Sequence, residues 1–361
     1  MAIQPDAVLD PTPTLDAARR AFGAFVDLLS RDARAVALHD SDADGVTAGV
    51  VWQYSFKRAG FAQALRVTPD RERNAWTKAN KDRVRACAPE SLFVLDLGSG
   101  PQPIIDNLPT CFIDHHRPEG VPPEATLISA YSWQPIPNTS LLVWKLCATI
   151  TDTSDLDWIA AIGTLSDLGD NAPFDLLATA KRKYKSKYLK EATVLINAAR
   201  RSSIYDPEAA ARALLQHANP RALVNSDADE VQQLRLAREE VKAAMNEAKK
   251  AAPVFAGSVA LVRMSSPCQI HPLIAQIWRS RLPRYIVIAA NEGYLPNRVN
   301  FSARSAANVS VLKFLREIEL SEGEGYHGHG HDQASGGSLP IQRWNELLAK
   351  LGFGSEVFAV S

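Results

Sequence analysis

The sequence carries no net charge, because 40 lysine and arginine residues balance 40 aspartate and glutamate residues in a chain of 361. A neutral chain is not expected to bind polyanions non-specifically, although a local basic groove can still hold nucleic acid. The sequence also has no apolar run of about 18 residues, the length that spans a membrane, and no charged and apolar leader at its start. We therefore expect a cytoplasmic protein with no membrane partner.

Cysteine is scarce, and its four copies are scattered without a Cys-x-x-Cys pair (Cys87, Cys111, Cys147 and Cys268). This spacing excludes a disulfide framework and a cysteine-rich zinc site, and it predicts buried free thiols in a reducing compartment. The hydrophobic content of 46% and charged content of 22% are those of a globular protein. The length allows two domains with hydrophobic cores.

Three apolar runs end abruptly in acidic residues. Residues 34–38 lead into HDSDADG, residues 91–95 lead into DLGSG, and residues 111–113 lead into Asp114, His115 and His116. Each run predicts a strand, and open α/β sheets bind ligands at the carboxyl ends of their strands. Carboxylate and imidazole donors suit a divalent ion such as manganese or magnesium. The sequence therefore predicts a metal site at this edge of a sheet.

The alternation of strand, acidic loop and helix predicts an α/β fold whose N-terminal part is a doubly wound, mainly parallel sheet. We expect a proline-rich flexible tail at 1–13, a catalytic domain at 14–225, a connector helix at 226–252 and a smaller α/β domain at 253–361. Within the first domain, helices are predicted at 14–29, 46–58, 78–86, 101–108, 141–150 and 155–168. Asn138 or Thr139 is expected to cap the helix at 141–150.

Six carboxylates are predicted to converge, namely Asp40, Asp42, Asp44, Asp96, Asp114 and Asp167. Such a group repels itself unless cations compensate it, and two divalent ions about 3.5–4 Å apart would do so. Asp96, by its central position, would bridge them, and a bridging water would become a nucleophile near neutral pH. His116 could polarise a phosphate or protonate the leaving oxygen. A calcium-binding EF-hand loop is excluded, because Val51 stands where that loop requires glutamate.

One dense basic segment, KRKYKSKYLK at 181–190, allows two interpretations. It is typical of a solvated helix face, which is what most charge runs are. It could also form a surface that follows a phosphate backbone, with Tyr184 and Tyr188 stacking on bases.

The motifs DSDADG, VLD, IDHH and TLSD, in this order, resemble the four motifs of the DHH phosphoesterase superfamily. NFSARS followed by GHGHDQASGG resembles its companion DHHA1 domain, so the resemblance runs from about residue 34 to 340. It implies manganese ligands at Asp42, Asp44, Asp96, His115 and Asp167. Asp114 would support or ligate the metal, and His116 would assist catalysis. The resemblance places Arg304 and Ser305, with the glycine-histidine segment containing Gly330, His331 and Gly336, at the substrate phosphate or sugar.

The first motif departs from many members of the superfamily, which have histidine two or four residues before the acid equivalent to Asp42. Here those positions hold Asp40 and Leu38, while His39 is out of step. The form DxDADG is closer to RecJ nucleases than to oligoribonucleases. The first metal could therefore be completed by Asp40 or by His39.

The leading hypothesis is a manganese-dependent phosphodiesterase that hydrolyses single-stranded DNA or short oligonucleotides by two-metal activation of water, in the manner of a RecJ exonuclease. Magnesium could replace manganese. A second hypothesis keeps the site but assigns a small substrate, such as a nanoRNA, a dinucleotide or 3′-phosphoadenosine 5′-phosphate. A third is a replication-associated binding module without metals, which the intact acidic motifs disfavour.

Overall fold

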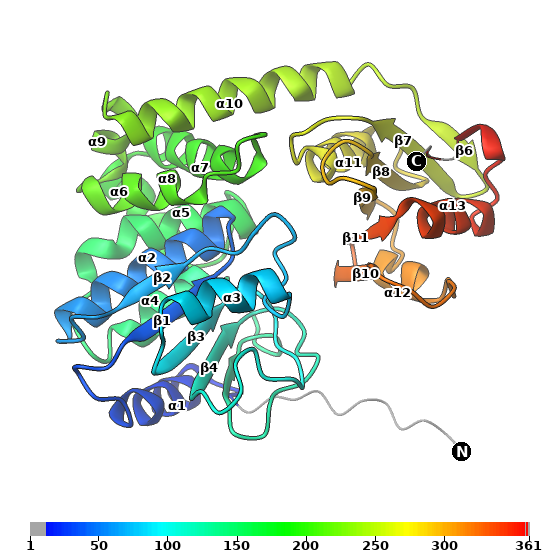
Figure 1. The fold of residues 1–361 in the computed structure, drawn as a ribbon. Coiled ribbons are helices and arrows are strands. Elements are labelled where there is room, and N and C mark those ends of the chain that lie inside the picture. Colours follow the sequence, from blue (N-terminus) through cyan, green and yellow to red (C-terminus); the bar gives the residue numbers. More distant parts are fainter. Residues whose placement is uncertain (1–11, 358, 360–361) are drawn as a thin grey trace. The chain divides into compact units, whose positions relative to one another are not determined.

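The computed structural model describes residues 12–357 and residue 359, apart from the side chains at 329, 331 and 357. The chain divides into two compact units (Figure 1). The first comprises the residues up to Arg200 together with Tyr205–Arg235, and the second comprises Arg201–Ile204 and Leu236 onward. Residues 1–11 of the tail predicted at 1–13 lie outside the described residues. Thr12 is 1% exposed, and its hydroxyl donates to the Ser129 carbonyl.

The first unit contains the predicted doubly wound sheet. Its five strands are β1 (Ala35–His39), β2 (Leu65–Val67), β3 (Ser91–Leu95), β4 (Thr110–Asp114) and β5 (Thr126–Ser129). They lie in the order β2-β1-β3-β4-β5, and every neighbouring pair is parallel. The α/β fold class is thereby confirmed. Because β1, β3 and β4 are neighbours, their carboxyl ends lie side by side at one edge of the sheet.

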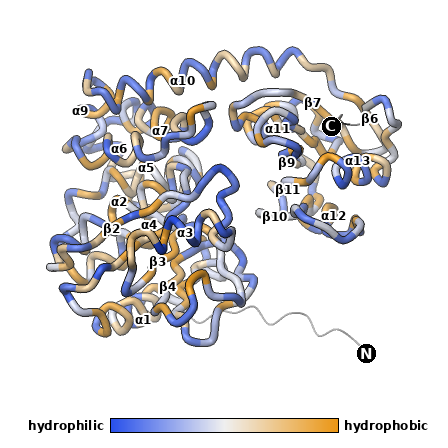
Figure 2. The backbone as a smooth tube through the Cα atoms, in the orientation of Figure 1, coloured by the Kyte–Doolittle hydropathy of each residue, from blue (hydrophilic) through white to orange (hydrophobic). Residues whose placement is uncertain are grey.

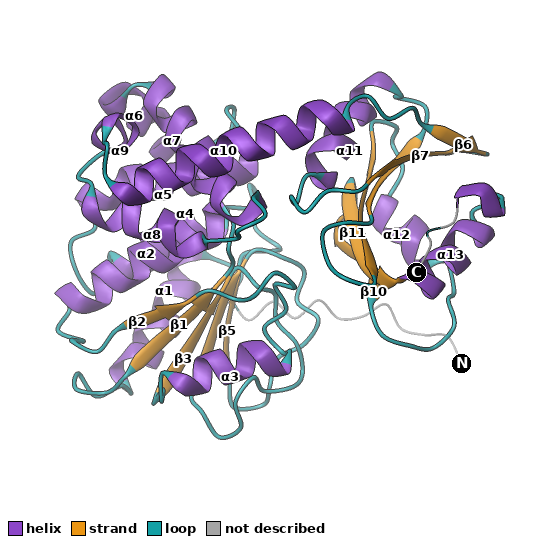
Figure 3. Cartoon of the chain, turned by 45° about the horizontal axis from the view of Figure 1, so that its top comes forward, coloured by secondary structure: helices purple, strands orange, loops and turns teal. Residues whose placement is uncertain are grey.

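Helices cover both faces of this sheet. The helices of the first unit are α1 (Leu15–Asp27), α2 (Ala43–Arg58), α3 (Lys78–Ala86), α4 (Thr139–Cys147), α5 (Asp157–Leu168), α6 (Asp175–Tyr184), α7 (Ser186–Arg201), α8 (Pro207–Gln216) and α9 (Pro220–Asn225). Alternate strand residues divide the core: Ala35 and Ala37 pack with α1, α2 and α4, whereas Val36 and Leu38 pack with α3. Figure 3 shows α3 and α2 on opposite sides of the strands. Figure 2 shows the corresponding hydropathy, with β3 hydrophobic and α3 mostly hydrophilic.

Several predicted helices are confirmed, and one is wrong. Thr14 caps α1 by accepting from the Ala17 amide, and α3 has the predicted bounds. Residues 101–108, predicted to be a helical crossover, instead form bends and a turn between β3 and β4. Pro101 and Pro103 lack amide donors, and each proline disfavours the helical conformation of the residue before it. Asn107 also has a φ of 58°, which a helix excludes.

The second unit is a smaller α/β fold, as predicted. Its strands are β6 (Val254–Ala256), β7 (Val259–Met264), β8 (Ile286–Asn291), β9 (Arg298–Ser305), β10 (Tyr326–His331) and β11 (Ala334–Pro340). They lie in the order β10-β11-β9-β8-β7-β6, with only the β7–β8 pair parallel. One face packs on α12 (Val311–Arg316) and α13 (Ile341–Lys350), and the other on α11 (His271–Arg281) and α10 (Asp229–Ala248). Helix α10 begins in the first unit and continues into the second.

Among the described residues, no helix has the length and apolar character needed to cross a membrane. All four cysteines are free thiols, and three of them are buried, while Cys87 is half-buried.

Candidate metal centre

The acidic motifs meet at the carboxyl edge of the parallel sheet. Asp40 follows β1, Asp96 follows β3 and Asp114 ends β4, so neighbouring strands deliver all three. Helix α5 brings Asp167 from its last turn, and the first turn of α2 brings Asp44. Their possible ligand atoms form three groups, and the atoms of one group all lie within 4.8 Å of one another. The first group is Asp96, Asp114, His115 and His116, the second is Asp44, His115 and Asp167, and the third is Asp40, Asp42 and Asp96. Asp96 and His115 each belong to two groups.

Asp44 is fixed by the start of α4. Its Oδ1 accepts from the Asn138 side-chain amide at 2.6 Å and the Ser140 amide at 2.7 Å, and its Oδ2 accepts from the Thr139 amide at 3.0 Å. Asn138 occupies the predicted cap position, but its side chain makes no capping bond to the helix. The carboxylate of Asp44 therefore satisfies the first amides of α4 and is held rigidly while doing so.

Thr139 joins the carboxylate of Asp96 to the ring of His115. Its hydroxyl donates to Asp96 Oδ1 at 2.9 Å and lies 3.0 Å from His115 Nδ1. Asp96 itself has a φ of 64°, in the left-handed region. Aspartate tolerates this conformation better than most residues, and it is found at functional turns. The short exit after β3 thus directs the Asp96 carboxylate toward the centre.

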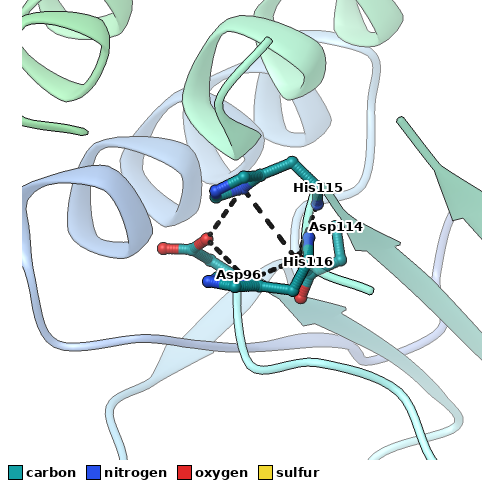
Figure 4. A group of neighbouring side chains, drawn as sticks. All are labelled: Asp96, Asp114, His115 and His116. Atoms are coloured by element: carbon teal, nitrogen blue, oxygen red, sulfur yellow. Dashed lines mark hydrogen bonds and ion pairs between the residues drawn. The ribbon is translucent and has the colours of Figure 1, made fainter. Parts of the chain in front are cut away.

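Asp114 organises the two histidines. Its Oδ1 accepts from the His115 amide at 2.6 Å, the His116 amide at 2.7 Å and the His116 Nδ1–H at 2.7 Å, while Oδ2 accepts from the Gly98 amide at 2.6 Å. Figure 4 shows both rings beside the Asp96 carboxylate. Burial alone would raise the pKa of Asp114, but the charge and hydrogen bond of His116 lower it below its usual value. With its oxygens so engaged, Asp114 supports the histidines.

The remaining carboxylates are crowded and shielded from water. Burial, followed by the charge of neighbouring carboxylates, raises the pKa of Asp44 and of Asp96 well above the usual value. The same causes raise the pKa of Asp167 to about 6. Buried acids that repel one another are stabilised by a multivalent cation, and oxygen and imidazole donors are the ligands that manganese and magnesium accept. The donor set therefore fits a divalent metal centre.

Asp40 and His39, the two candidates for completing the first metal, lie in different surroundings. Asp40 lies with Asp42 and Asp96, whereas His39 belongs to none of the three groups. By alternation along β1, His39 faces α2, where its ring lies against Gly49 and its Nδ1 is 2.7 Å from the Asp40 carbonyl. Burial, followed by the charge of Arg66, lowers the pKa of His39 to about 4. Its ring is thus part of the helix–sheet contact.

Two arginines that sequence reasoning missed lie at the acids. Arg73 comes from the loop between β2 and α3, and its guanidinium binds Asp40 through both oxygens and reaches Asp42 at 3.4 Å. Arg200, near the end of α7, lies 3.7 Å from Asp42. No motif marks either arginine in the sequence. Thr139 was visible there only as a possible helix cap.

The substrate-binding residues expected from the resemblance lie in the second unit. Arg304 is on β9 opposite Ala334, while Gly336 on β11 and Gly330 on β10 lie on the next two strands. Among the described residues, Arg304 Nε is buried without a hydrogen-bond partner, and burial together with nearby Arg279 lowers the pKa of Arg304.

Ser305 and His331 complete the set of expected substrate-binding residues. Ser305 is 1% exposed, and its hydroxyl oxygen accepts from the Ala307 amide. It therefore closes a turn after β9. The backbone of His331 belongs to β10, but its side chain lies outside the described part of the chain.

Three of the six cationic side chains of the basic segment at 181–190 form ion pairs within the first unit. Lys181 and Lys190 both pair with Asp170 at 2.8 Å, and Lys183 pairs with Asp157 at 3.0 Å. Tyr184 donates its hydroxyl to Asp157 at 2.6 Å. These contacts favour the interpretation as a solvated helix face.

The chain matches no family model, and no curated protein matches it in sequence. Solved structures nevertheless resemble it. RecJ from Thermus thermophilus in complex with Mn²⁺ aligns with 96% of this chain and 55% of its own, with a TM-score of 0.63 and 18% identity. This chain therefore spans about half the length of that RecJ. An exonuclease RecJ bound to manganese aligns over 99% of both chains, with a TM-score of 0.58 and 20% identity.

A third solved structure widens the comparison beyond RecJ. The DHH domain of a member of the s1p family of ribosomal proteins aligns with 96% of this chain and 90% of its own, with a TM-score of 0.64 and 15% identity. At these identities the likeness concerns the fold. The chain has the DHH-type fold of RecJ.

Proposed function

We propose that this protein is a metal-dependent phosphoesterase of the DHH/DHHA1 superfamily. The observation that carries the proposal is the convergence of three ligand groups at one edge of the sheet, of which the first is linked to the second by His115 and to the third by Asp96. Divalent ions held by these groups would supply a water of lowered pKa and neutralise the charge of a phosphate. The ligands would be Asp40, Asp42, Asp44, Asp96, His115 and Asp167.

His116 is suited to protonating the leaving oxygen. Its Nδ1–H is bound by Asp114, so its other nitrogen faces away from that carboxylate. Burial alone would lower the pKa of His116, but the charge and hydrogen bond of Asp114 raise it to about 9. In the ion-free centre the ring is therefore protonated at neutral pH, and its side chain is 36% exposed, which leaves it accessible to a substrate.

For the substrate we propose single-stranded DNA or a short oligonucleotide, with manganese as the preferred ion. The DxDADG form of the first motif and the fold shared with two manganese-bound RecJ structures support this choice. Arg304 would bind a phosphate, because its guanidinium fork matches phosphate oxygens and its buried Nε has no hydrogen-bond partner among the described residues.

A small nucleotide is the second candidate substrate. It is favoured by the ion pairs of Lys181, Lys183 and Lys190, which engage half of the six cationic side chains of the basic segment. A nanoRNA, a dinucleotide or 3′-phosphoadenosine 5′-phosphate would need only the centre and one phosphate-binding arginine.

The test offers manganese and two substrates, a labelled dinucleotide and a single-stranded DNA of about twenty bases labelled at either end. We expect mononucleotides to be released from the DNA by the wild type and by Asp106→Asn, an exposed control outside the centre, but not by Asp114→Ala. Cleavage of the dinucleotide alone would assign the small-substrate function. Tight DNA binding without cleavage or manganese binding would contradict the enzymatic proposal and identify a metal-free binding module.

A further inference from the structure

A guanidinium group occupies one end of the acidic centre. Arg73 Nε donates to Asp40 Oδ1 at 2.6 Å, and its Nη2 donates to Asp40 Oδ2. The same Nη2 lies 3.4 Å from Asp42 Oδ2. Both carboxylates belong to the group that contains Asp96. A bidentate arginine is a strong and geometrically specific partner for a carboxylate, so Arg73 uses the oxygens that would ligate a metal at this end.

The loop that carries Arg73 is built to hold it there. Arg73 has a φ of 56°, in the left-handed region, and its amide donates to the Asp70 carbonyl at 3.1 Å. Asp70 is bound in turn by Asn80, which is 0% exposed, through contacts of 2.8 and 3.1 Å. The Tyr205 hydroxyl lies 3.0 and 2.8 Å from the carbonyl oxygens of Pro69 and Asp70. An unusual backbone conformation supported by this many contacts indicates a fixed position.

The other end of the centre is held by different donors. Asp44, which groups with His115 and Asp167, accepts from the Asn138 side-chain amide and from the backbone amides of Thr139 and Ser140. These donors are neutral, and they orient the carboxylate without opposing an incoming cation. The two arginines, Arg73 and Arg200, therefore lie at the end that contains Asp42, whereas the donors to Asp44 are neutral.

We propose that Arg73 acts as a built-in competitor for the metal ion at Asp40, Asp42 and Asp96, so that the two ions of the centre bind unequally. This inference rests on the proposed function. The ion at Asp44, His115 and Asp167 binds tightly. The ion at the other end must displace the guanidinium from Asp40 and tolerate a positive charge a few ångströms away, so it binds weakly. Arg73 thereby determines the manganese concentration at which the centre fills.

The test measures manganese binding by isothermal titration calorimetry, with free manganese counted by electron paramagnetic resonance. The wild type is expected to bind one tight and one weak ion. Arg73→Gln should tighten the weak ion at least tenfold and change the tight ion less than threefold. Arg73→Lys, which keeps the charge but loses the fork, should give an intermediate affinity for the weak ion.

Arg71→Gln is the matched control, because it removes the same charge from the same loop. The Arg71 guanidinium lies over the Tyr205 ring, 5.7 Å from its centroid, rather than on Asp40. The affinity of Arg71→Gln for the weak ion should differ from that of the wild type by less than twofold. If circular dichroism shows that Arg73→Gln does not fold, Arg73→Lys provides the test. Tighter binding of the weak ion than in the wild type supports the proposal, and unchanged or weaker binding contradicts it.

Three outcomes would overturn the inference while leaving the metal centre intact. These are equal affinity of both ions in the wild type, unchanged or weaker binding of the weak ion in the Arg73 variants, or an equal shift in Arg71→Gln. Failure of the wild type to bind any manganese would instead contradict the proposed function itself.

Discussion

A single hydroxyl group, that of Thr139, connects Asp96 to His115. Because it donates to Asp96 Oδ1 at 2.9 Å, its oxygen is left to accept from His115 Nδ1, 3.0 Å away. A neutral His115 then carries its proton on Nδ1 and a lone pair on Nε2, the nitrogen 3.4 Å from Asp167 Oδ2. Thr139 thus selects the tautomer that can ligate a metal between Asp44 and Asp167.

Removing this hydroxyl should weaken metal binding. We expect Thr139→Val to lower manganese affinity at least tenfold, because the hydrogen-bond partners of ligating histidines commonly contribute that much. Nitrogen-15 NMR should show Nδ1–H in His115 of the wild type and a mixture of tautomers in the variant. Thr139→Ser, which restores the hydroxyl, should recover both properties. Wild-type affinity and tautomer in Thr139→Val would refute this role.

Asp96 should lower the stability of the fold when metal is removed. Its pKa is raised by burial and by neighbouring carboxylates, so its ionised form opposes folding at pH 8. With a chelator present, Asp96→Asn is expected to raise the free energy of unfolding by about 1 kcal/mol or more. Manganese at 100 times its dissociation constant should stabilise the wild type by about 2.7 kcal/mol, and the variant by less, because the variant lacks one carboxylate of the group Asp40, Asp42 and Asp96.

Thermal unfolding with and without manganese measures both effects. Asp106→Asn removes an exposed carboxylate and should behave like the wild type in either condition. If Asp96→Asn were less stable than the wild type in chelator, the ionised carboxylate would stabilise the fold even without an ion, which would contradict this prediction.

Two helical glycines should respond to alanine with opposite signs. A Cβ at Gly163 in α5 would lie 2.4 Å from Thr47 Oγ1 and 2.6 Å from Ser140 Cβ, whereas a Cβ at Gly23 in α1 would meet nothing within 4 Å. Gly163→Ala should therefore lose about 1–3 kcal/mol of stability through overpacking. Gly23→Ala should gain about 0.5–1 kcal/mol from helix propensity. Urea denaturation of both variants tests this, and a stabilising Gly163→Ala would contradict the packing found between α2, α4 and α5.

His39 should make the first unit sensitive to acid. Burial lowers its pKa from 6.5 to about 4, so the unfolded chain takes up a proton before the folded chain does as the pH falls. The stability contributed by the neutral ring is present above pH 6.5 and is lost between about pH 6.5 and 4. Between about pH 7.5 and 5 this loss is about 2 kcal/mol.

The comparison uses His39→Gln, unfolded by urea in the presence of a chelator at both pH values. The wild type should lose about 2 kcal/mol more than the variant over this interval. His217→Gln, which replaces a half-buried histidine of the same unit, serves as the control. An equal loss in the wild type and His39→Gln would show that His39 is not responsible.

The parts of the centre carried by strands could be predicted from the sequence, because parallel strands end at a common edge. Asp96 and His115 follow apolar runs, and runs of this kind pair side by side. The position of His39 also follows from alternation, since Ala35 and Ala37 face the same helices. That periodicity could have excluded His39 from the centre before the structure was known.

Arg73 could not be found in this way, because its position depends on a left-handed loop residue and on anchors distant in sequence, such as Tyr205. Thr139 was expected only as an alternative to Asn138 at the cap of α4, a position that Asn138 takes. Its hydroxyl gained its role only when α4 packed against the acidic loops. The helix predicted at 101–108 failed for a local reason, since its prolines outweighed the expectation of a helical crossover.

Asp44 has two roles, because it accepts hydrogen bonds from the first amides of α4 and also faces the metal centre. A lineage that abandoned catalysis could discard Asp96 and gain stability, but it could not discard Asp44 without leaving the first amides of a buried helix unsatisfied. Retention of Asp44 among descendants would therefore be explained by its structural role at the start of α4 and would not indicate activity. An aspartate at position 96 is the more informative mark of a working enzyme.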